Sequence, residues 1–261
     1  MHKKFLFICG CPRSGTSYFQ AILAWHPAIA LGTERFNLRL FARTLMPTDF
    51  ERERFFRMEA GDTWYDDLSH FSWRQRRAEA HYDSAEYVGD KVPRAYECFD
   101  HLITYFPDVR FICLVRNLFD VAASYESRQR DVADWNPDWG PRMAVEHWNA
   151  SLKAILAYAD VAPILPVFYE DLVASEATVD GVAAFLDIDP EPLRTGWKNK
   201  ARLESQPKPG AGADRLTPED VAFITAAADQ DALARVTQLA RRITDRPAPS
   251  VTSRRSSRSS K

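Results

Sequence analysis

The residues that could do chemistry begin with a phosphate-binding loop near the amino terminus. Residues 10–17 (GCPRSGTS) follow directly on the apolar run of residues 5–9. Gly10 and Gly15 have the spacing of a P-loop, in which backbone N–H groups and a helix N-terminus converge on a phosphate. A nucleoside triphosphatase has lysine after the second glycine, where this chain has Thr16, and Arg13 supplies the positive charge instead. The loop is predicted to hold a phosphate without handling ATP in the usual way.

A second cation is predicted at the end of a strand. Residues 109–115 (VRFICLV) form an almost continuous apolar run, typical of a buried parallel strand, which stops at Arg116. Asn117 is a good N-cap for the next helix, which carries Ser124. A P-loop triphosphatase has aspartate at such a strand end to hold magnesium, whereas a guanidinium suits a second phosphate group. Loop and strand end together indicate a receptor for a nucleotide phosphorylated at two places.

Two more charged residues are expected at strand ends. Glu34 follows the extended residues 28–31, and Lys91 ends a short strand within residues 86–93. The carboxyl ends of parallel strands share one edge of a sheet, so both side chains would lie near the loop. Taken alone, Glu34 reads better as a solvated loop acid and Lys91 as an ordinary surface lysine.

The order of the predicted strands and helices that carry these residues indicates an α/β fold of the P-loop type. We expect three layers, α/β/α, with a central, mostly parallel sheet and helical insertions. Predicted strands cover residues 5–10, 28–31, 86–93, 109–115 and 163–169; predicted helices cover residues 17–25, 96–106, 118–125, 144–158, 176–186, 217–230 and 231–243. Residues 126–143 are expected to form a long polar and aromatic connection that could act as a lid, and residues 198–210 a basic, irregular stretch.

The length and composition predict a single globular domain over residues 1–245. It includes a helical insertion at about residues 36–84, rich in Arg and in aromatics that mostly face the core, and precedes a disordered basic tail at 246–261. Removing the four tail cations at positions 254, 255, 258 and 261 changes the net charge from −2 to −6, which excludes a nucleic-acid surface.

The cysteines and the amino terminus give two further expectations. Cys9 and Cys113 fall in apolar runs and are expected as buried free thiols, and the CxC at Cys9 and Cys11 lacks the second ligand pair of a zinc site. The basic-then-apolar amino terminus is cut short by Gly10 and Pro12, and no apolar stretch is long enough for a transmembrane segment. The sequence therefore favours a cytoplasmic protein with an uncleaved amino-terminal strand.

These motifs together resemble the two-part signature of sulfotransferases that use 3′-phosphoadenosine 5′-phosphosulfate (PAPS). Residues 12–17 match its first part, and Arg116 with Ser124 its second; the bacterial and tyrosylprotein enzymes of that superfamily are the most similar. Residues 24–27 and 32–34 resemble the stretch with the catalytic glutamate, residues 90–93 the stretch with the active-site lysine, and residues 168–172 a later strand motif. The tyrosylprotein enzymes have Arg two residues beyond that glutamate, where this chain has Phe36, so their recognition of a peptide acceptor is not expected here.

The resemblance implies a role for each site residue. Arg13, Ser14, Gly15, Thr16 and Ser17 would bind the 5′-phosphosulfate of PAPS, while Arg116 and Ser124 would bind its 3′-phosphate. Glu34 would act as the general base, with Lys91 and Arg13 as cations in place of a metal, so no metal is expected.

The sequence also allows other functions and several kinds of partner. A small-molecule kinase with a degenerate P-loop is an alternative that Thr16 and the missing strand-end aspartate disfavour; a catalytically inactive nucleotide-binding module is another. The expected acceptor is a small-molecule, carbohydrate or lipid hydroxyl, in a pocket that Trp64, Trp73, Trp135 and Trp139 could line. A homo-oligomer is compatible with the sequence.

Overall fold

A parallel β-sheet forms the centre of the molecule. The computed structural model describes residues 3–63, 73–132, 135–203 and 210–244. Its five-stranded sheet has the order β2-β3-β1-β4-β5, and every neighbouring pair is parallel. The strands are β1 (Lys4–Gly10), β2 (Ile29–Thr33), β3 (Tyr87–Lys91), β4 (Arg110–Val115) and β5 (Ile164–Phe168). All five carboxyl ends therefore lie at one edge, as expected for the site residues.

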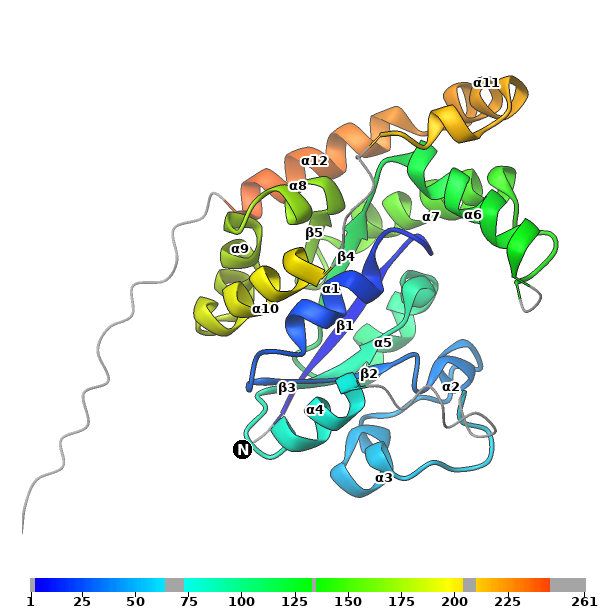
Figure 1. Cartoon of the computed structure of the whole chain (residues 1–261). Helices are drawn as coiled ribbons and strands as arrows, with labels where there is room; N and C mark the ends of the chain where they lie inside the picture. Colours follow the sequence, from blue (N-terminus) through cyan, green and yellow to red (C-terminus); the bar gives the residue numbers. More distant parts are fainter. Residues whose placement is uncertain (1–2, 64–72, 133–134, 204–209, 245–261) are drawn as a thin grey trace, which may run out of the picture.

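Helices cover both faces of this sheet, which confirms the predicted three-layer α/β fold (Figure 1). Along β1, Phe5, Phe7 and Cys9 enter one hydrophobic cluster while Leu6 and Ile8 enter the other. The second cluster packs on α1 (Thr16–Leu23), α8 (Tyr169–Ala174), α9 (Ala177–Leu186) and α10 (Pro190–Leu203). The first packs on the 3₁₀ helix η3 (Pro93–Cys98) and on α5 (Phe99–Tyr105), α6 (Leu118–Asp131) and α7 (Pro141–Tyr158).

Two helices at the carboxyl-terminal end complete this arrangement. The α11 helix (Pro218–Ala227) begins at Thr217, whose hydroxyl accepts a hydrogen bond from Asp220 N, as its N-cap pattern predicts. The α12 helix (Gln230–Thr244) contacts β5 and α7 at the open edge of the sheet. No helix in the described ranges is long and apolar enough to cross a membrane.

Short helical elements connect β2 to β3. They are α2 (Asn37–Phe41), the 3₁₀ helix η1 (Pro47–Phe50), α3 (Arg52–Phe56) and α4 (Trp73–His81). Phe50 is buried, with its ring centroid 5.9 Å from that of Phe5 and 5.8 Å from that of Phe7, so the aromatic side chains join this segment to the sheet. Phe41 and Trp73 are exposed, contrary to the core position expected for most of these aromatics, and Trp64, Tyr65 and Phe71 lie outside the described residues.

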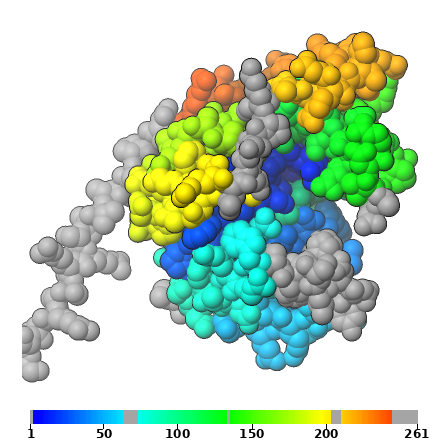
Figure 2. All heavy atoms as spheres, in the orientation of Figure 1, coloured from blue at the N-terminus to red at the C-terminus, as the bar shows by residue number. Residues whose placement is uncertain are grey.

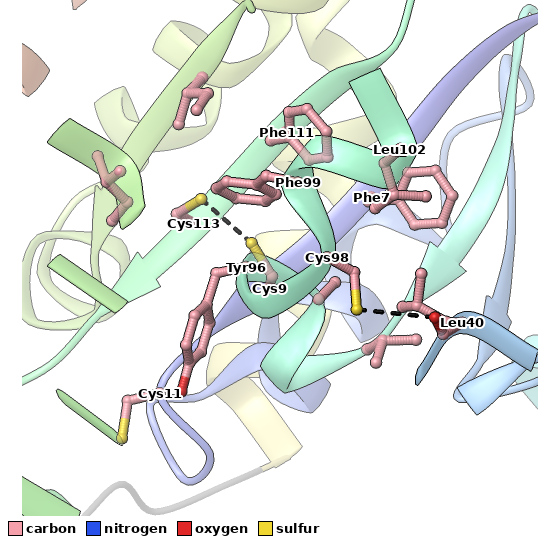
Figure 3. Packing of buried hydrophobic residues seen from close by; sticks show 14 of the residues in the cluster. Phe7, Cys9, Cys11, Leu40, Tyr96, Cys98, Phe99, Leu102, Phe111 and Cys113 are labelled. Atoms are coloured by element: carbon pink, nitrogen blue, oxygen red, sulfur yellow. Dashed lines mark hydrogen bonds between the residues drawn. The ribbon is translucent and has the colours of Figure 1, made fainter. Parts of the chain in front are cut away.

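The core contains the cysteines as buried thiols (Figure 3). Cys9 and Cys113 occupy paired positions on β1 and β4, with 3.1 Å between their sulfur atoms, and Cys98 contacts the carbonyl of Leu40. Burial raises the pKa of the Cys11 thiol to about 12, so this thiol stays protonated at neutral pH. The expectation of buried free thiols at Cys9 and Cys113 is confirmed.

The helix boundaries correct three predictions. Residues 126–131 extend α6, where Glu126 and Arg130 form an i,i+4 ion pair of 3.1 Å, so the predicted connection is short and lies before Pro141. Residues 198–203 of the basic stretch are the end of α10 and not irregular, because Leu193 and Trp197 of this helix pack on the second cluster; residues 204–209 of the stretch lie outside the described residues. The helix expected over residues 96–106 begins as the 3₁₀ helix η3.

Candidate active site

The loop after β1 makes a tight turn onto α1. Gly10 and Gly15 have φ values of +137° and +93°, in the region that L side chains rarely adopt. A Cβ atom on Gly15 would lie 2.3 Å from the ring of Tyr169, so only glycine allows this close approach. Gly15 is the N-cap of α1, and the first N–H groups of a helix have no partner within it. The turn can therefore present backbone donors to an anion.

Two arginines and Ser124 meet at this loop. Arg13 Nε donates to Ser124 Oγ over 2.9 Å, and Arg116 Nη1 donates to the carbonyl oxygen of Arg13 over 3.2 Å. The Arg116 guanidinium lies 4.4 Å from the centroid of the Tyr169 ring and 3.8 Å from the Asp120 carboxylate. The structure thus joins the loop to Arg116 and Ser124, more than a hundred residues further along the chain.

Positive charge is concentrated at this place. The pKa of Arg13 is lowered, first by burial and then by the charges of Arg128 and Arg116. Arg116 Nε is buried and has no hydrogen-bond partner among the described residues, and the same holds for the hydroxyl of the fully buried Ser14. A bound anion would offset the repulsion between the guanidinium groups and give Arg116 a partner.

Glu34 and Lys91 form an ion pair at the ends of β2 and β3. Lys91 Nζ donates to Glu34 Oε1 over 2.5 Å, and the two strands are in register with Thr33 opposite Lys91. The Lys91 side chain is 2% exposed and that of Glu34 is 28% exposed. Gln20 of α1 fixes this strand end by donating to Gly32 O and to Thr33 Oγ1, both over 2.8 Å.

These groups open onto one cavity of about 420 Å³. It brings together seven of the predicted site residues: Arg13, Gly15, Thr16, Ser17, Glu34, Lys91 and Arg116. Ser14 is fully buried and Ser124 accepts a hydrogen bond from Arg13, and neither of these two residues lines the cavity. The deep-blue segment that contains β1 and the loop lies between the yellow, green and cyan segments in Figure 2.

Aromatic side chains form part of the wall of this cavity. Trp135 and Trp139 line the cavity as expected, with 5.4 Å between their ring centroids, whereas Trp73 does not line it and Trp64 lies outside the described residues. The Arg94 guanidinium lies 5.5 Å from the ring of Phe41 and 5.1 Å from that of Trp139.

The sequence reasoning missed several parts of this wall. Asn37, Phe41, Pro93 and Arg94 also line the cavity. Glu97 holds Arg94 in place with hydrogen bonds of 2.6 and 2.8 Å. Their positions in the sequence were the available signal: Pro93 and Arg94 lie two and three residues after Lys91, and Asn37 lies three residues after Glu34.

A second cavity, of about 530 Å³, lies on the other side of Arg116. Residues from the ends of β4 and β5 and from α6, α7, α11 and α12 line it; they include Phe119, Trp148, Thr225, Gln230 and Leu233. The Asp120 carboxylate, buried at the start of α6, accepts hydrogen bonds from Gly210 N (2.9 Å) and Gly212 N (2.8 Å). Asp120 thus connects Arg116 to a segment ninety residues away, which no sequence pattern had indicated.

Arg35, the residue after Glu34, lies away from the cavity. Its side chain is buried in the segment between β2 and β3, where it pairs with Asp62 over 2.6 Å and donates to the carbonyls of Phe55 and Arg57. It is therefore a structural cation. In the described parts of the chain, no group of three or more His, Cys, Asp or Glu side chains is placed to hold a metal ion.

Comparison with curated proteins finds relatives that are sulfotransferases by name. The chain is 32% identical over 176 residues to protein-tyrosine sulfotransferase 1 of Danio rerio, an alignment that covers 64% of this chain and 48% of that protein. It is 27% identical over 191 residues to a putative protein-tyrosine sulfotransferase of Caenorhabditis briggsae, covering 71% of this chain and 66% of that one. The chain spans about half to two thirds of the length of these relatives.

Solved structures share the fold. A sulfotransferase from Alicyclobacillus acidocaldarius superposes with a TM-score of 0.55 at 17% identity, over 92% of this chain and 96% of that one. Mouse sulfotransferase SULT7A1, in a complex with PAP, superposes with a TM-score of 0.54 at 14% identity, over 95% of this chain and 90% of that one. The model of the sulfotransferase family matches residues 6–192, which is more than half of the sequence. The chain therefore belongs to the sulfotransferase family.

Proposed function

We propose that this protein transfers a sulfuryl group from PAPS to an acceptor hydroxyl. The observation that carries the proposal is the single 420 Å³ cavity into which the loop, Arg13, Arg116 and the Glu34–Lys91 pair all open. One part of this cavity suits an anion and the other presents a carboxylate beside a lysine. A group-transfer enzyme needs these two functions within reach of one reacting atom.

The donor would lie along the loop and across Arg116. The backbone of Gly15, Thr16 and Ser17 and the Arg13 guanidinium would hold the 5′-phosphosulfate, with Ser14 supporting the turn from below. Arg116 would hold the 3′-phosphate. Its unpartnered Nε and the glycine turn fit a nucleotide with two anionic ends. Ser124 would act by orienting Arg13, to which it is bonded, or by turning to the 3′-phosphate when the donor binds.

We propose that the nucleoside of the donor binds in the second cavity. This cavity shares Arg116 with the first cavity and has mainly apolar walls, with Asn117, Glu170, Thr225 and Gln230 as hydrogen-bonding groups. A flat base needs such a combination of apolar surface and a few polar groups. We therefore place the adenosine of PAPS on this side of Arg116.

The transfer itself needs a base and cations. PAPS supplies an activated sulfuryl group whose bond to the phosphate oxygen breaks as the bond to the acceptor oxygen forms. Glu34 would take the proton of the acceptor hydroxyl, and Lys91 and Arg13 would stabilise the charge that develops on the departing phosphate oxygen. Lys91 would turn from Glu34 toward that oxygen. These cations occupy the place that a magnesium ion has in phosphoryl transfer, so the reaction is proposed to need no metal.

The acceptor would be a small molecule with a flat, apolar face. Phe41, Trp135 and Trp139 form the aromatic part of the cavity wall, and Asn37 and Arg94 are polar side chains of the same wall. A phenol or an alicyclic alcohol would stack on these aromatic side chains. The named relatives are protein-tyrosine sulfotransferases. With Arg35 buried and Phe36 in the next position, a free small hydroxyl compound fits this cavity better than a peptide.

The proposal is tested with labelled PAPS and a panel of phenols, alicyclic alcohols, sugars and tyrosine peptides, with and without EDTA. We expect sulfated product from wild-type protein in both conditions. Glu34→Gln should lose turnover by a factor on the order of 100 or more while it still binds 3′-phosphoadenosine 5′-phosphate (PAP), because proton transfer contributes about that much. Full activity of Glu34→Gln would remove Glu34 as the base, and an absolute need for magnesium would refute the metal-free mechanism.

A further inference from the structure

A completely buried carboxyl group lies beside the catalytic strand end. Asp90 precedes Lys91 on β3, is 0% exposed, and lies opposite Phe7 of β1 and Gly32 of β2 in the sheet. One of its oxygens, Oδ2, accepts a hydrogen bond from Phe36 N over 3.0 Å. The other, Oδ1, has no hydrogen-bond partner among the described residues. Such a group costs free energy to bury, so an apolar residue would suit this strand position better for stability alone.

Asp90 holds the turn that carries Glu34. Glu34 has φ +54°, a conformation that is uncommon for residues other than glycine and that persists only when its surroundings impose it. The N–H of Glu34 donates to Lys91 O over 2.9 Å, and the N–H of Phe36, two residues later, donates to Asp90. Two consecutive residues of β3 therefore fix both ends of the turn, and Lys91 also binds the Glu34 carboxylate.

The space around Asp90 is shaped for this contact. A Cβ atom on Gly32 would lie 2.9 Å from Asp90 Oδ1 and 2.8 Å from the Cβ of Arg35, so a larger residue would push the turn away. Arg35 is held from the other side by Asp62 and by the carbonyls of Phe55 and Arg57. The turn is thus clamped between β3 and the segment that follows it.

The charges that face Asp90 are those of Lys91, Glu34 and Arg35. Burial raises the pKa of Asp90 to about 7, while the Phe36 N–H, Lys91 and Arg35 lower it and Glu34 raises it. The carboxyl oxygen can accept the bond from Phe36 in either protonation state.

We propose that Asp90 is a positioning residue for the transfer reaction: its hydrogen bond to Phe36 N fixes the turn in which Glu34 presents its carboxylate to Lys91 and to the acceptor hydroxyl. This inference rests on the proposed role of Glu34 as the base. Asp90 is fully buried and does not line the cavity, so it would act through the backbone of residues 33–36.

Asp90→Val is the decisive variant, because valine is apolar, favours strands and cannot accept a hydrogen bond. We expect its kcat to fall on the order of 100-fold, as for a catalytic group displaced by about 1 Å. Its thermal stability and its affinity for PAP should be unchanged or higher, and its amide exchange at Phe36 faster. Asp90→Asn, which keeps a carbonyl acceptor, should restore kcat to within about threefold of wild type.

Asp49→Val is a matched control. Asp49 is also buried and also accepts a backbone bond, from Met46 N over 2.8 Å, but it lies on η1, does not line the cavity, and in addition pairs with Arg39 (3.2 Å) and Arg54 (3.7 Å). This variant should leave kcat unchanged. The inference is overturned if Asp90→Val is folded with a kcat close to wild type, or if Asp90→Asn is as slow as Asp90→Val.

Amide exchange at Phe36 tests the role of Asp90 independently of the proposed function. If wild-type protein shows no turnover with any acceptor, the proposed function fails, and the protection of the Phe36 amide still reports on the clamp. Equal protection of this amide in wild type and in Asp90→Val would then refute the role of Asp90.

Discussion

Arg116 connects the two cavities of the site. Its guanidinium lines both of them, stacks on Tyr169 and lies near Asp120, and it donates to the loop carbonyl of Arg13. These contacts fix its orientation before any ligand is present. We propose that the remaining N–H groups of Arg116 bind the 3′-phosphate of the donor.

Arg116→Ala should weaken PAP binding about 10- to 100-fold, because a hydrogen bond to a charged group contributes about 1.5–3 kcal/mol. Isothermal titration with PAP measures this directly. Arg110→Ala is the control, since Arg110 lies at the opposite end of β4 and contacts the carbonyl of Phe185. Equal affinity of Arg116→Ala and wild type would refute the 3′-phosphate site.

The raised pKa of Asp90 has a consequence for stability. In the folded protein this pKa is about 7, against an ordinary value of 3.8, so the folded state binds the Asp90 proton more tightly than the unfolded chain. The stabilisation is complete below pH 4 and is lost as the pH rises to about 7. Relative to Asp90→Asn, the wild-type free energy of unfolding should fall by up to about 4 kcal/mol between pH 4 and pH 8. Urea denaturation across this range tests the expectation, and parallel curves for the two proteins would contradict it.

At the scale of elements, the strands and charged strand ends could be predicted from the sequence. The apolar runs of β1 and β4 are continuous and end in strong local signals, the glycine turn and the Asn117 cap, whose side chain accepts from Phe119 N and Asp120 N. A parallel sheet then brings Glu34, Lys91 and Arg116 to one edge without further assumptions.

The acceptor wall and the clamps could not be predicted because they depend on contacts between distant segments. Arg94 reads as an ordinary surface cation until Phe41 and Trp139 enclose it. Asp120 binds Gly210 and Gly212 only because the chain returns to α6 after α10. Local periodicity describes one element at a time. It indicates the element on which a side chain lies, but not the distant residues that contact this side chain.

Asp120→Ala should loosen the connection between α6 and the segment at Gly210–Gly212. Two backbone N–H groups would lose their acceptor and Arg116 its nearby carboxylate, so we expect the donor KM to rise about 10-fold and the free energy of unfolding to fall by about 1–3 kcal/mol. Asp180→Ala, which breaks a surface ion pair with Arg194, should change neither quantity appreciably. A donor KM that stays at the wild-type value would contradict this role of Asp120.

At the scale of the whole molecule, donor binding should stabilise the fold by mass action. PAP at 100 times its Kd is expected to add about 2.7 kcal/mol, which corresponds to an increase in Tm of roughly 5–10 °C for a chain of this size. EDTA should not change the increase, and Mg²⁺ with ATP should not reproduce it, because Thr16 replaces the P-loop lysine. An increase with Mg²⁺ and ATP alone would favour the kinase alternative.

The residues of the site come from both sides of β1 in the sheet. The groups proposed to hold the donor come from the loop after β1 and from β4 and α6, whereas Asn37 and Phe41 of the acceptor wall belong to the connection between β2 and β3 (Figure 1). Exchanging the part of that connection after Glu34 for one from another family member would replace Asn37 and Phe41, and it would leave Trp135, Trp139 and every proposed contact to the donor's phosphates in place. New acceptor preferences can thus arise by loop exchange or point mutation while the chemistry of the donor stays constant.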